Sequence, residues 1–542
     1  MQILTKEEMY TADRYAIVET GISGYTLMEC AGQAMAEEIK TYIDEKEAAN
    51  PDSGKNRYSK ILVISGPGNN GGDGIVIARR LLNKGMDAQL WICEAEASIK
   101  NEALEALGIY KKSNYYFNVY TEMNRHKLED SIKNADIIID ALLGIGATGI
   151  PREPYKHMIQ EINKSEAYIF SVDIPSGVGA DEADSDCGVY ADVTLTIQFP
   201  KLSAYLYPVA ENYGQSKLID IGITCPKNQM KNPRFVWTEK EHQQVTNLSK
   251  KDDHKGKNGS VLIIGGSRNM IGAPIMATMA CARAGTGLVY LGTPKANKEV
   301  AASRILEAMH LDCKEEDGYI TDVDMPEKVD IVAIGMGLGR NPLSMNLVEK
   351  ILDSDIPILI DGDGLYFLKE KKEKLKQRKA ITVITPHMGE MAGLCDTDTD
   401  DIRKYRFNIS REFAMEYGVY VVLKGPNTIV SCPNGTQYVN TSGNQSLAKG
   451  GAGDILAGIV AGKMAVNLKK EAIYMEAKKY RCDNFENKET FKYQDSSLFE
   501  DDELTGKTII DAVYIHGKAA DRLIEAGGEY QSILPTDLVW EL

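Results

Sequence analysis

The sequence predicts two α/β domains, each built on a mostly parallel sheet with helices on both faces. The chain has 542 residues, which exceeds the size at which one hydrophobic core keeps growing. Short, continuously apolar runs alternate with segments of helical spacing, as expected for parallel strands buried on both faces. Two glycine-rich acidic segments, residues 68–74 and 449–454, lie in separate series of strands and helices. We therefore expect one functional site in each domain.

The first domain is expected over residues 1–224. Residues 7–43 have helical spacing and should cover a sheet face or form an oligomer contact. A helix is predicted from about Gly74 to Lys84. Strands are predicted at residues 61–65, 88–93, 136–140, 168–173 and 193–199.

Residues 225–257 are expected to hold the linker and the start of the second domain. From Thr224 to Lys257 the chain is polar, rich in lysine and asparagine, and without a clear sheet pattern. The second domain should then span residues 258–542, with strands at 260–265, 288–292, 330–335, 357–361, 380–385 and 419–424. Its charged segment 477–507 is interpreted as a solvated or partly disordered insertion rather than as a lid or subunit contact.

Composition and charge exclude several functions. The formal net charge of -16 argues against a general binder of nucleic acids or anionic membranes, since both need a cationic surface. The nine cysteines are scattered, odd in number and without a Cys-x-x-Cys pair, which fits a reducing compartment. The N-terminus carries acids where a signal peptide needs an apolar core, and no apolar run approaches membrane-spanning length. These features predict a cytoplasmic protein.

The glycine-rich segment 68–74 lies where a strand ends and a helix begins, which is where open α/β sheets bind ligands. Its asparagines and backbone amides can hold phosphate or ribose, and a side-chain carbonyl can coordinate a cation. Two further acids end strands, so Asp73, Asp140 and Asp173 are expected to converge for acid and base chemistry. The alternative for any one of them is a helix cap or a turn residue.

The second segment, residues 449–454, precedes an apolar run that reads as a helix. Its free amides and positive dipole end suit a phosphate group, and Asp454 is the candidate base for phosphoryl transfer. The alternative is a tightly packed helix start that Asp454 merely caps. Lys424 leaves a strand at a plausible edge for an adenine nucleotide, and His387 follows another strand, where it is either a ligand contact or a hydrogen-bonded turn histidine.

Residues 1 to about 225 resemble the YjeF N-terminal domain, the NAD(P)H-hydrate epimerase family, through segments 69–74, 140–149 and 173–177. The resemblance implies a Rossmann-like three-layer α/β/α domain in which Asp173 is the acid/base residue. It also implies a potassium ion held by Asn70, Asp140 and Ser176. The residues implied to hold the hydrated dinucleotide are Asn69, Asn70, Gly71, Gly72, Asp73, Gly144, Ile145, Gly146, Ala147, Thr148, Gly149, Ile150 and Asp173.

Residues from about 240 to the end, except 477–507, resemble the NAD(P)H-hydrate dehydratase family, whose fold is ribokinase-like. The matching segments are 254–256, 265–267, 272–274, 335–339, 361–364, 385–387, 424–425 and 449–454. The resemblance implies that Ala273, Gly337, His387 and Asp454 contact the hydrated substrate. Nucleotide contacts are implied for Lys424, Gly425, Pro426, Asn427, Thr428 and Gly453.

The two resemblances together predict a bifunctional repair enzyme for hydrated nicotinamide cofactors. The first domain would interconvert the R and S epimers of NADH or NADPH hydrate, and the second would dehydrate the S epimer with ADP and Mg²⁺. The residues alone do not exclude ATP. We also expect a homo-oligomer. Two alternatives are a vitamin or small-molecule kinase fused to a nucleotide-binding domain, and an N-terminal domain kept only for sensing or interaction, although Asp73 and Asp173 are both present.

Overall fold

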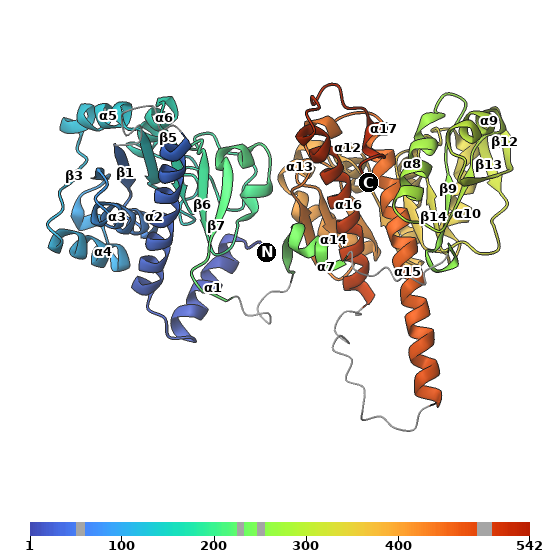
Figure 1. Ribbon diagram of the computed structural model, residues 1–542, viewed down its shortest axis with the longest axis horizontal. Helices are drawn as coiled ribbons and strands as arrows, with labels where there is room; N and C mark the ends of the chain where they lie inside the picture. The colour runs from blue at the N-terminus through green and yellow to red at the C-terminus, as the bar shows by residue number, and fades with distance from the viewer. Residues whose placement is uncertain (50–59, 225–231, 246–254, 485–500) are drawn as a thin grey trace. The chain divides into compact units, whose positions relative to one another are not determined.

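The computed structural model describes residues 1–49, 60–224, 232–245, 255–484 and 501–542 (Figure 1). The chain forms two compact units, Gln2–Lys231 and Asn232–Leu542, with Met1 grouped with the latter. No helix within the described ranges is both long enough and apolar enough to cross a membrane.

The first unit contains a seven-stranded, fully parallel sheet of order β3-β2-β1-β4-β5-β6-β7. Its strands are β1 Ile61–Ser65, β2 Ala88–Ile92, β3 Phe117–Val119, β4 Ile137–Ala141, β5 Tyr168–Val172, β6 Val193–Ile197 and β7 Gln215–Ile219. Its helices are α1 Lys6–Val18, α2 Gly24–Ala49, α3 Asn69–Asn83, α4 Asn101–Lys112, α5 Arg125–Asn134 and α6 Tyr155–Lys164. Strand order reverses between β1 and β4, and open α/β sheets bind ligands at the carboxyl ends of the strands beside such a point.

Helices cover both faces of this sheet. Ile61 and Val63 of β1 pack into one apolar core with α2, α3 and α4. Leu62 and Ile64 alternate with them and pack into a second core with α5 and α6. This alternation follows from the two-residue repeat of a strand. The predicted Rossmann-like three-layer α/β/α domain is therefore confirmed.

The second unit contains a ten-stranded sheet of order β11-β10-β9-β14-β15-β16-β17-β18-β19-β8 and a separate β12-β13 hairpin. Its strands are β8 Arg234–Trp237, β9 Ser260–Ile264, β10 Leu288–Gly292, β11 Ala308–Leu311, β12 Cys313–Glu316, β13 Tyr319–Val323, β14 Ile331–Ile334, β15 Ile358–Ile360, β16 Thr382–Ile384, β17 Tyr420–Leu423, β18 Ile429–Ser431 and β19 Gln437–Asn440. The pairs from β11 to β17 are parallel, and the β17–β18 and β18–β19 pairs are antiparallel.

Both faces of this second sheet are also covered. Its helices are α7 Glu239–Val245, α8 Gly272–Arg283, α9 Lys295–Arg304, α10 Met345–Leu352, α11 Asp363–Lys371, α12 Met388–Cys395, α13 Thr399–Lys404, α14 Arg406–Tyr417, α15 Ala452–Asn484, α16 Asp501–Glu525 and α17 Pro535–Leu538. Val261 and Ile263 face a core with α8, α15 and α16, whereas Leu262 and Ile264 face a core with α10, α11 and α14. In Figure 1, α15 and α16 lie side by side.

Two local predictions differ from the structure, and a third falls largely outside the described residues. Helix α3 begins at Asn69, so the glycine-rich segment is its first turn rather than a loop before a helix at Gly74. The range from Thr224 to Lys257 does contain a strand, since β8 pairs with β19 at the sheet edge. The charged segment 477–507 is helical at both ends, in α15 and α16, and its centre, 485–500, lies outside the described residues.

Candidate active sites

In the first unit, Asp173 follows β5 and has a left-handed backbone with φ of 65°. Its Oδ1 accepts hydrogen bonds from the backbone N–H of Ile197, at 3.0 Å, and from the ammonium group of Lys201. The Lys201 side chain is completely buried. A buried ammonium group needs a partner of opposite charge, so this ion pair fixes the orientation of the Asp173 carboxylate.

Two further carboxyl groups surround this ion pair. Asp73 lies in the first turns of α3 and is only 7% exposed. Burial raises its pKa well above the usual range, and the charges of Asp173 and Asp13 raise it further, while Lys201 acts in the opposite sense. Burial and Asp173 also raise the pKa of Asp13, on α1, to about 6. We call these four residues, Asp13, Asp73, Asp173 and Lys201, the carboxylate cluster. The sequence analysis did not identify Asp13 or Lys201.

The prediction that Asp140 joins Asp73 and Asp173 was wrong. Asp140 lies inside β4 on the sheet face of Ile138, opposite the face that α3 covers. It is fully buried, and its carboxylate accepts hydrogen bonds from Ser171 Oγ at 2.8 Å and from the N–H and hydroxyl of Ser176. Burial raises the pKa of Asp140, and these hydrogen bonds oppose the increase. The third acid near Lys201 is therefore Asp13 rather than Asp140.

The three residues implied to hold potassium do lie together. Asn70 Nδ2 donates to the carbonyl of Leu143 at 3.0 Å, and the N–H of Leu143 donates to Ser176 Oγ at 2.8 Å. Ser176 Oγ in turn donates to Asp140. Amide, hydroxyl and carboxylate oxygens of this kind suit a hard cation.

The two loops implied to hold the dinucleotide lie at the carboxyl ends of β1 and β4. Residues 69–73 open α3, and a Cβ on Gly71 would lie 1.9 Å from the carbonyl oxygen of Gly66. Residues 144–150 follow β4, and a Cβ on Gly144 would lie 2.9 Å from Asn70 Cβ. Gly149 has φ of 71°, and Ile150 is 58% exposed. The two loops thus adjoin each other, and their glycines allow close backbone approach.

In the second unit, Asp454 is the third residue of α15, so its carboxylate lies at a helix N-terminus. Burial raises its pKa to about 7, and the negative charge of Asp361 adds to the increase. Lys424 acts in the opposite sense, and Asp363 and Glu390 contribute smaller increases. A carboxylate poised near neutral pH is suited to general base catalysis.

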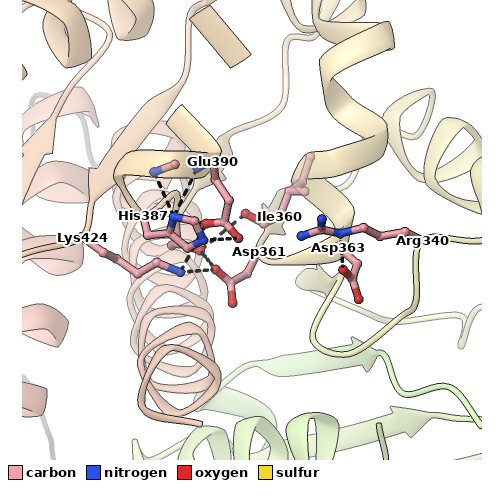
Figure 2. Close-up of polar contacts among 9 residues, drawn as sticks. Arg340, Ile360, Asp361, Asp363, His387, Glu390 and Lys424 are labelled. Atoms are coloured by element: carbon pink, nitrogen blue, oxygen red, sulfur yellow. Dashed lines mark hydrogen bonds and ion pairs between the residues drawn. The ribbon is translucent and has the colours of Figure 1, made fainter. Parts of the chain in front are cut away.

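Lys424 forms the centre of an ion-pair cluster (Figure 2). Its charge also interacts with that of Asp454. Its Nζ lies 2.7 Å from Asp361 Oδ1 and 3.8 Å from Glu390 Oε2. Thr385 Oγ1 donates to the same Asp361 oxygen at 2.6 Å. A Cβ on Gly453 would lie 3.4 Å from Lys424 Nζ, so the lysine reaches the start of α15. The backbone amides at the start of α15, the ammonium group of Lys424 and the carboxylate of Asp454 therefore lie close together.

His387 has the local role that the sequence analysis gave as the alternative. It is the N-cap of α12, and its Nδ1 accepts hydrogen bonds from the N–H groups of Gly389 and Glu390 at 3.0 and 3.2 Å. Accepting at Nδ1 places the ring proton of a neutral imidazole on Nε2. The side chain is 59% exposed, so a bound ligand can still contact the ring.

The remaining predicted residues flank this cluster. A Cβ on Gly337, where φ is 65°, would lie 3.0 Å from the Cβ of Ala273 at the start of α8. Helix α8 packs against α15. Residues 424–428 form the turn between β17 and β18, in which Thr428 Oγ1 donates to the Gly425 carbonyl at 3.0 Å. Pro426 and Asn427 complete this turn, and Asn427 has φ of 53°.

Fold and geometry define a two-site α/β enzyme. One site has acid and base groups at the carboxyl ends of the strands, and the other has a carboxylate at a helix N-terminus. Residues 24–203 match the family model of the YjeF-related protein N-terminus, and residues 261–541 match that of NAD(P)H-hydrate dehydratase. The chain belongs to the family of bifunctional NAD(P)H-hydrate repair enzymes. Both family models match within this one chain, and relatives of that family are similar to it over most of their length.

Two of these relatives are bifunctional NAD(P)H-hydrate repair enzymes. That of Moorella thermoacetica is 33% identical over 482 residues, covering 86% of this chain and 89% of the relative. That of Coxiella burnetii is 30% identical over 528 residues, covering 96% and 94%. A crystal structure of ADP/ATP-dependent NAD(P)H-hydrate dehydratase from Bacillus subtilis, co-crystallized with ATP/Mg²⁺, is 25% identical with a TM-score of 0.45, covering 57% of this chain and 95% of that one.

Proposed function

We propose that this chain repairs hydrated nicotinamide cofactors in two consecutive steps. The unit that contains Asp173 interconverts the two epimers of NADH or NADPH hydrate, and the unit that contains Asp454 dehydrates the S epimer. The observation that carries the proposal is the pairing of two acid sites in one chain of this family, one after β5 of the Rossmann-like sheet and one at the start of α15. Hydration removes the cofactor's ability to donate hydride and creates two epimers. A chiral dehydratase site accepts only one of them, so the other must first be epimerised.

The second site has the groups that phosphoryl transfer needs. In the proposed mechanism, Asp454 takes the proton of the ring hydroxyl, and the resulting alkoxide attacks the terminal phosphate of ADP. Lys424 and the amides at the start of α15 offset the charge on the transferred group. The ring nitrogen lone pair then expels phosphate, a far better leaving group than hydroxide, and NADH or NADPH is restored. Residues 424–428 and Gly453 would contact the nucleotide.

Two ions accompany this proposal. Potassium would be held by oxygen atoms of Asn70, Asp140 and Ser176. It would lie next to the segments implied to hold the dinucleotide, where its positive charge would stabilise a phosphate of the substrate. Within the described residues, no group of three or more His, Cys, Asp or Glu side chains is placed to hold a metal. Mg²⁺ is therefore proposed to be held mainly by the phosphates of ADP.

We further propose that the chain works in the cytoplasm as a homo-oligomer.

The proposed function is tested with purified protein, a mixture of NADH hydrate epimers and ADP. Absorbance of restored NADH should rise until both epimers are consumed, because the first site keeps supplying the S epimer. Omitting ADP should stop the recovery. Absence of recovery, combined with ADP formation from ATP on a vitamin precursor, would instead support the kinase alternative.

Dehydration of the S epimer should depend on pH through Asp454. The carboxylate must be ionised to act as a base, and burial raises its pKa to about 7. The kcat/KM for the S epimer should therefore fall about tenfold per pH unit below this value and level off above it. The initial rate is measured from about pH 5.5 to 8.5 with purified S epimer, before the first site converts much of it to the R epimer. A flat profile through neutral pH would contradict the assignment of Asp454 as the base.

A further inference from the structure

Helix α1 brings an acid to the first site from a part of the chain far from the strand ends. The segment before α1 docks beside Lys201, where the N–H of Leu4 donates to the carbonyl of Pro200 at 3.0 Å. The N–H of Lys6 donates to Asp181 Oδ1 at 3.1 Å. Apolar residues of this region, Leu4, Met9, Ala12 and Ala16, are buried together with Leu27, Phe199 and Ile223. The position of α1 relative to the first site is therefore fixed by packing.

The docked helix also lies against the loop 144–150. Lys6 Nζ donates to the carbonyl of Gly146 at 3.3 Å, and a Cβ on Gly146 would lie 3.4 Å from the Tyr10 hydroxyl. Asp13 follows Tyr10 by three residues, which places it on the same side of the helix. Among the carboxylate cluster, Asp13 is the most exposed member, whereas Asp73, Asp173 and Lys201 are all buried. A ligand held by this loop can therefore reach the Asp13 carboxyl.

Epimerisation by loss and re-addition of water requires two proton transfers on opposite faces of the ring. The hydroxyl must leave from one face with an added proton, and water must add to the other face with loss of a proton. One carboxyl group can serve one face only. Lys201 and Ile197 hold the Asp173 carboxylate in place, so proton transfer on the other face of the ring needs a second group from another element.

We propose that Asp13 is a second catalytic residue of the epimerase and acts on the ring face opposite Asp173. This inference rests on the proposed function of the first unit. For one epimer, the Asp13 carboxyl gives its proton to the departing hydroxyl, the carbon–oxygen bond breaks, and water leaves as the ring nitrogen lone pair forms a carbon–nitrogen double bond. Water then adds to the opposite face of this planar carbon and gives a proton to the Asp173 carboxylate. The other epimer follows the same steps in reverse.

The charged groups around Asp13 favour this exchange. It faces Tyr10 on its own helix, Asp73 on α3, Asp173 after β5 and Lys201. Burial and Asp173 together raise the pKa of Asp13 to about 6, against the effect of Lys201. A carboxyl group with this pKa can give and take a proton near neutral pH. Burial also raises the pKa of Asp73 well above its usual range.

The first test replaces Asp13 by Asn in the full chain. The rate of interconversion of the epimers, corrected for the spontaneous rate, should fall by about 100-fold or more. Dehydration of purified S epimer should be unchanged, because it takes place in the other unit. Glu7→Gln is the matched control, since Glu7 is an exposed acid on the same helix. An interconversion rate of Asp13→Asn within about threefold of the unaltered protein would overturn the proposal.

The second test needs no variant, so it holds even if Asp13→Asn fails to fold. Interconversion in water enriched in oxygen-18 should place the label on the ring hydroxyl once per inversion, above the exchange seen without protein. Inversion without label would show that the carbon–oxygen bond stays intact and would overturn the proposal. A protein that does not interconvert the epimers at all would instead refute the proposed function of the first unit, which keeps the two failures distinguishable.

Discussion

Asp454→Asn is expected to abolish recovery of NADH from either hydrate epimer. Asparagine has nearly the same shape as aspartate but cannot accept the proton of the ring hydroxyl. Loss of a general base lowers a rate by about 10² to 10⁴, and the remaining activity should not exceed the background. The measurement is NADH absorbance with purified S epimer and saturating ADP.

The surroundings of Asp454 explain why so large an effect is expected from one side chain. Burial and the charge of Asp361 hold its pKa at about 7, so that the carboxylate is a stronger base than an exposed aspartate. Lys424 lies beside it but is already paired with Asp361 and Glu390. Neither of these acids can replace Asp454, because each is engaged with the lysine.

The internal control for Asp454→Asn is the epimerase activity of the other unit. The Asp454→Asn protein should still interconvert the two epimers at the rate of the unaltered protein, since the carboxylate cluster is unchanged. NADH formation at more than a tenth of the original rate would show that Asp454 does not act as the base, because general base catalysis contributes at least about 10².

The extent to which these sites could be predicted depends on how local their signals are. Asp73 and Asp173 could be placed together because each follows a parallel strand, and such strands end at one edge of the sheet. Asp140 failed this rule because it lies within β4, where the two-residue repeat turns its side chain to the opposite face. The predicted strand ended at Asp140, whereas β4 ends at Ala141, and this difference of one residue placed Asp140 at the strand end instead of inside the strand.

Asp13 and Lys201 could not be predicted in the same way. Asp13 is part of a helix whose docking depends on contacts such as that between Leu4 and Pro200, which are distant in sequence. The amphipathic pattern of α1 predicts that one face of the helix is buried, but it does not predict which part of the sheet that face packs against. A lysine is usually exposed, so the sequence alone gives no reason to bury Lys201. In the second unit, the pairing of Lys424 with Glu390 likewise depends on the register of adjacent strands.

Asp173→Asn is expected to split the recovery of NADH into two phases. The S epimer should be recovered as fast as by the unaltered protein, because the second unit is untouched. The R epimer should follow only at the slow spontaneous rate of inversion. The reason is that the amide can neither take the proton from the adding water nor return it to the departing hydroxyl.

The fold should survive the Asp173→Asn change. Asparagine tolerates the left-handed backbone of residue 173 better than most residues do, so the φ of 65° remains accessible. Loss of a partner leaves the Lys201 ammonium group buried, which normally destabilises a protein by about 3 to 5 kcal/mol. Here Asp13 and Asp73 lie nearby, and their pKa values are raised partly by Asp173 itself. Without that repulsion both pKa values should fall, and an ionised carboxylate can then balance Lys201.

This argument yields a measurement that separates catalysis from stability. Thermal unfolding of Asp173→Asn at neutral pH should be close to that of the unaltered protein, because a neighbouring carboxylate balances the charge of Lys201. A single recovery phase, with both epimers consumed at the original rate, would contradict the role of Asp173. Two phases in a stably folded variant would assign epimerisation to the carboxylate cluster and dehydration to the site at the start of α15.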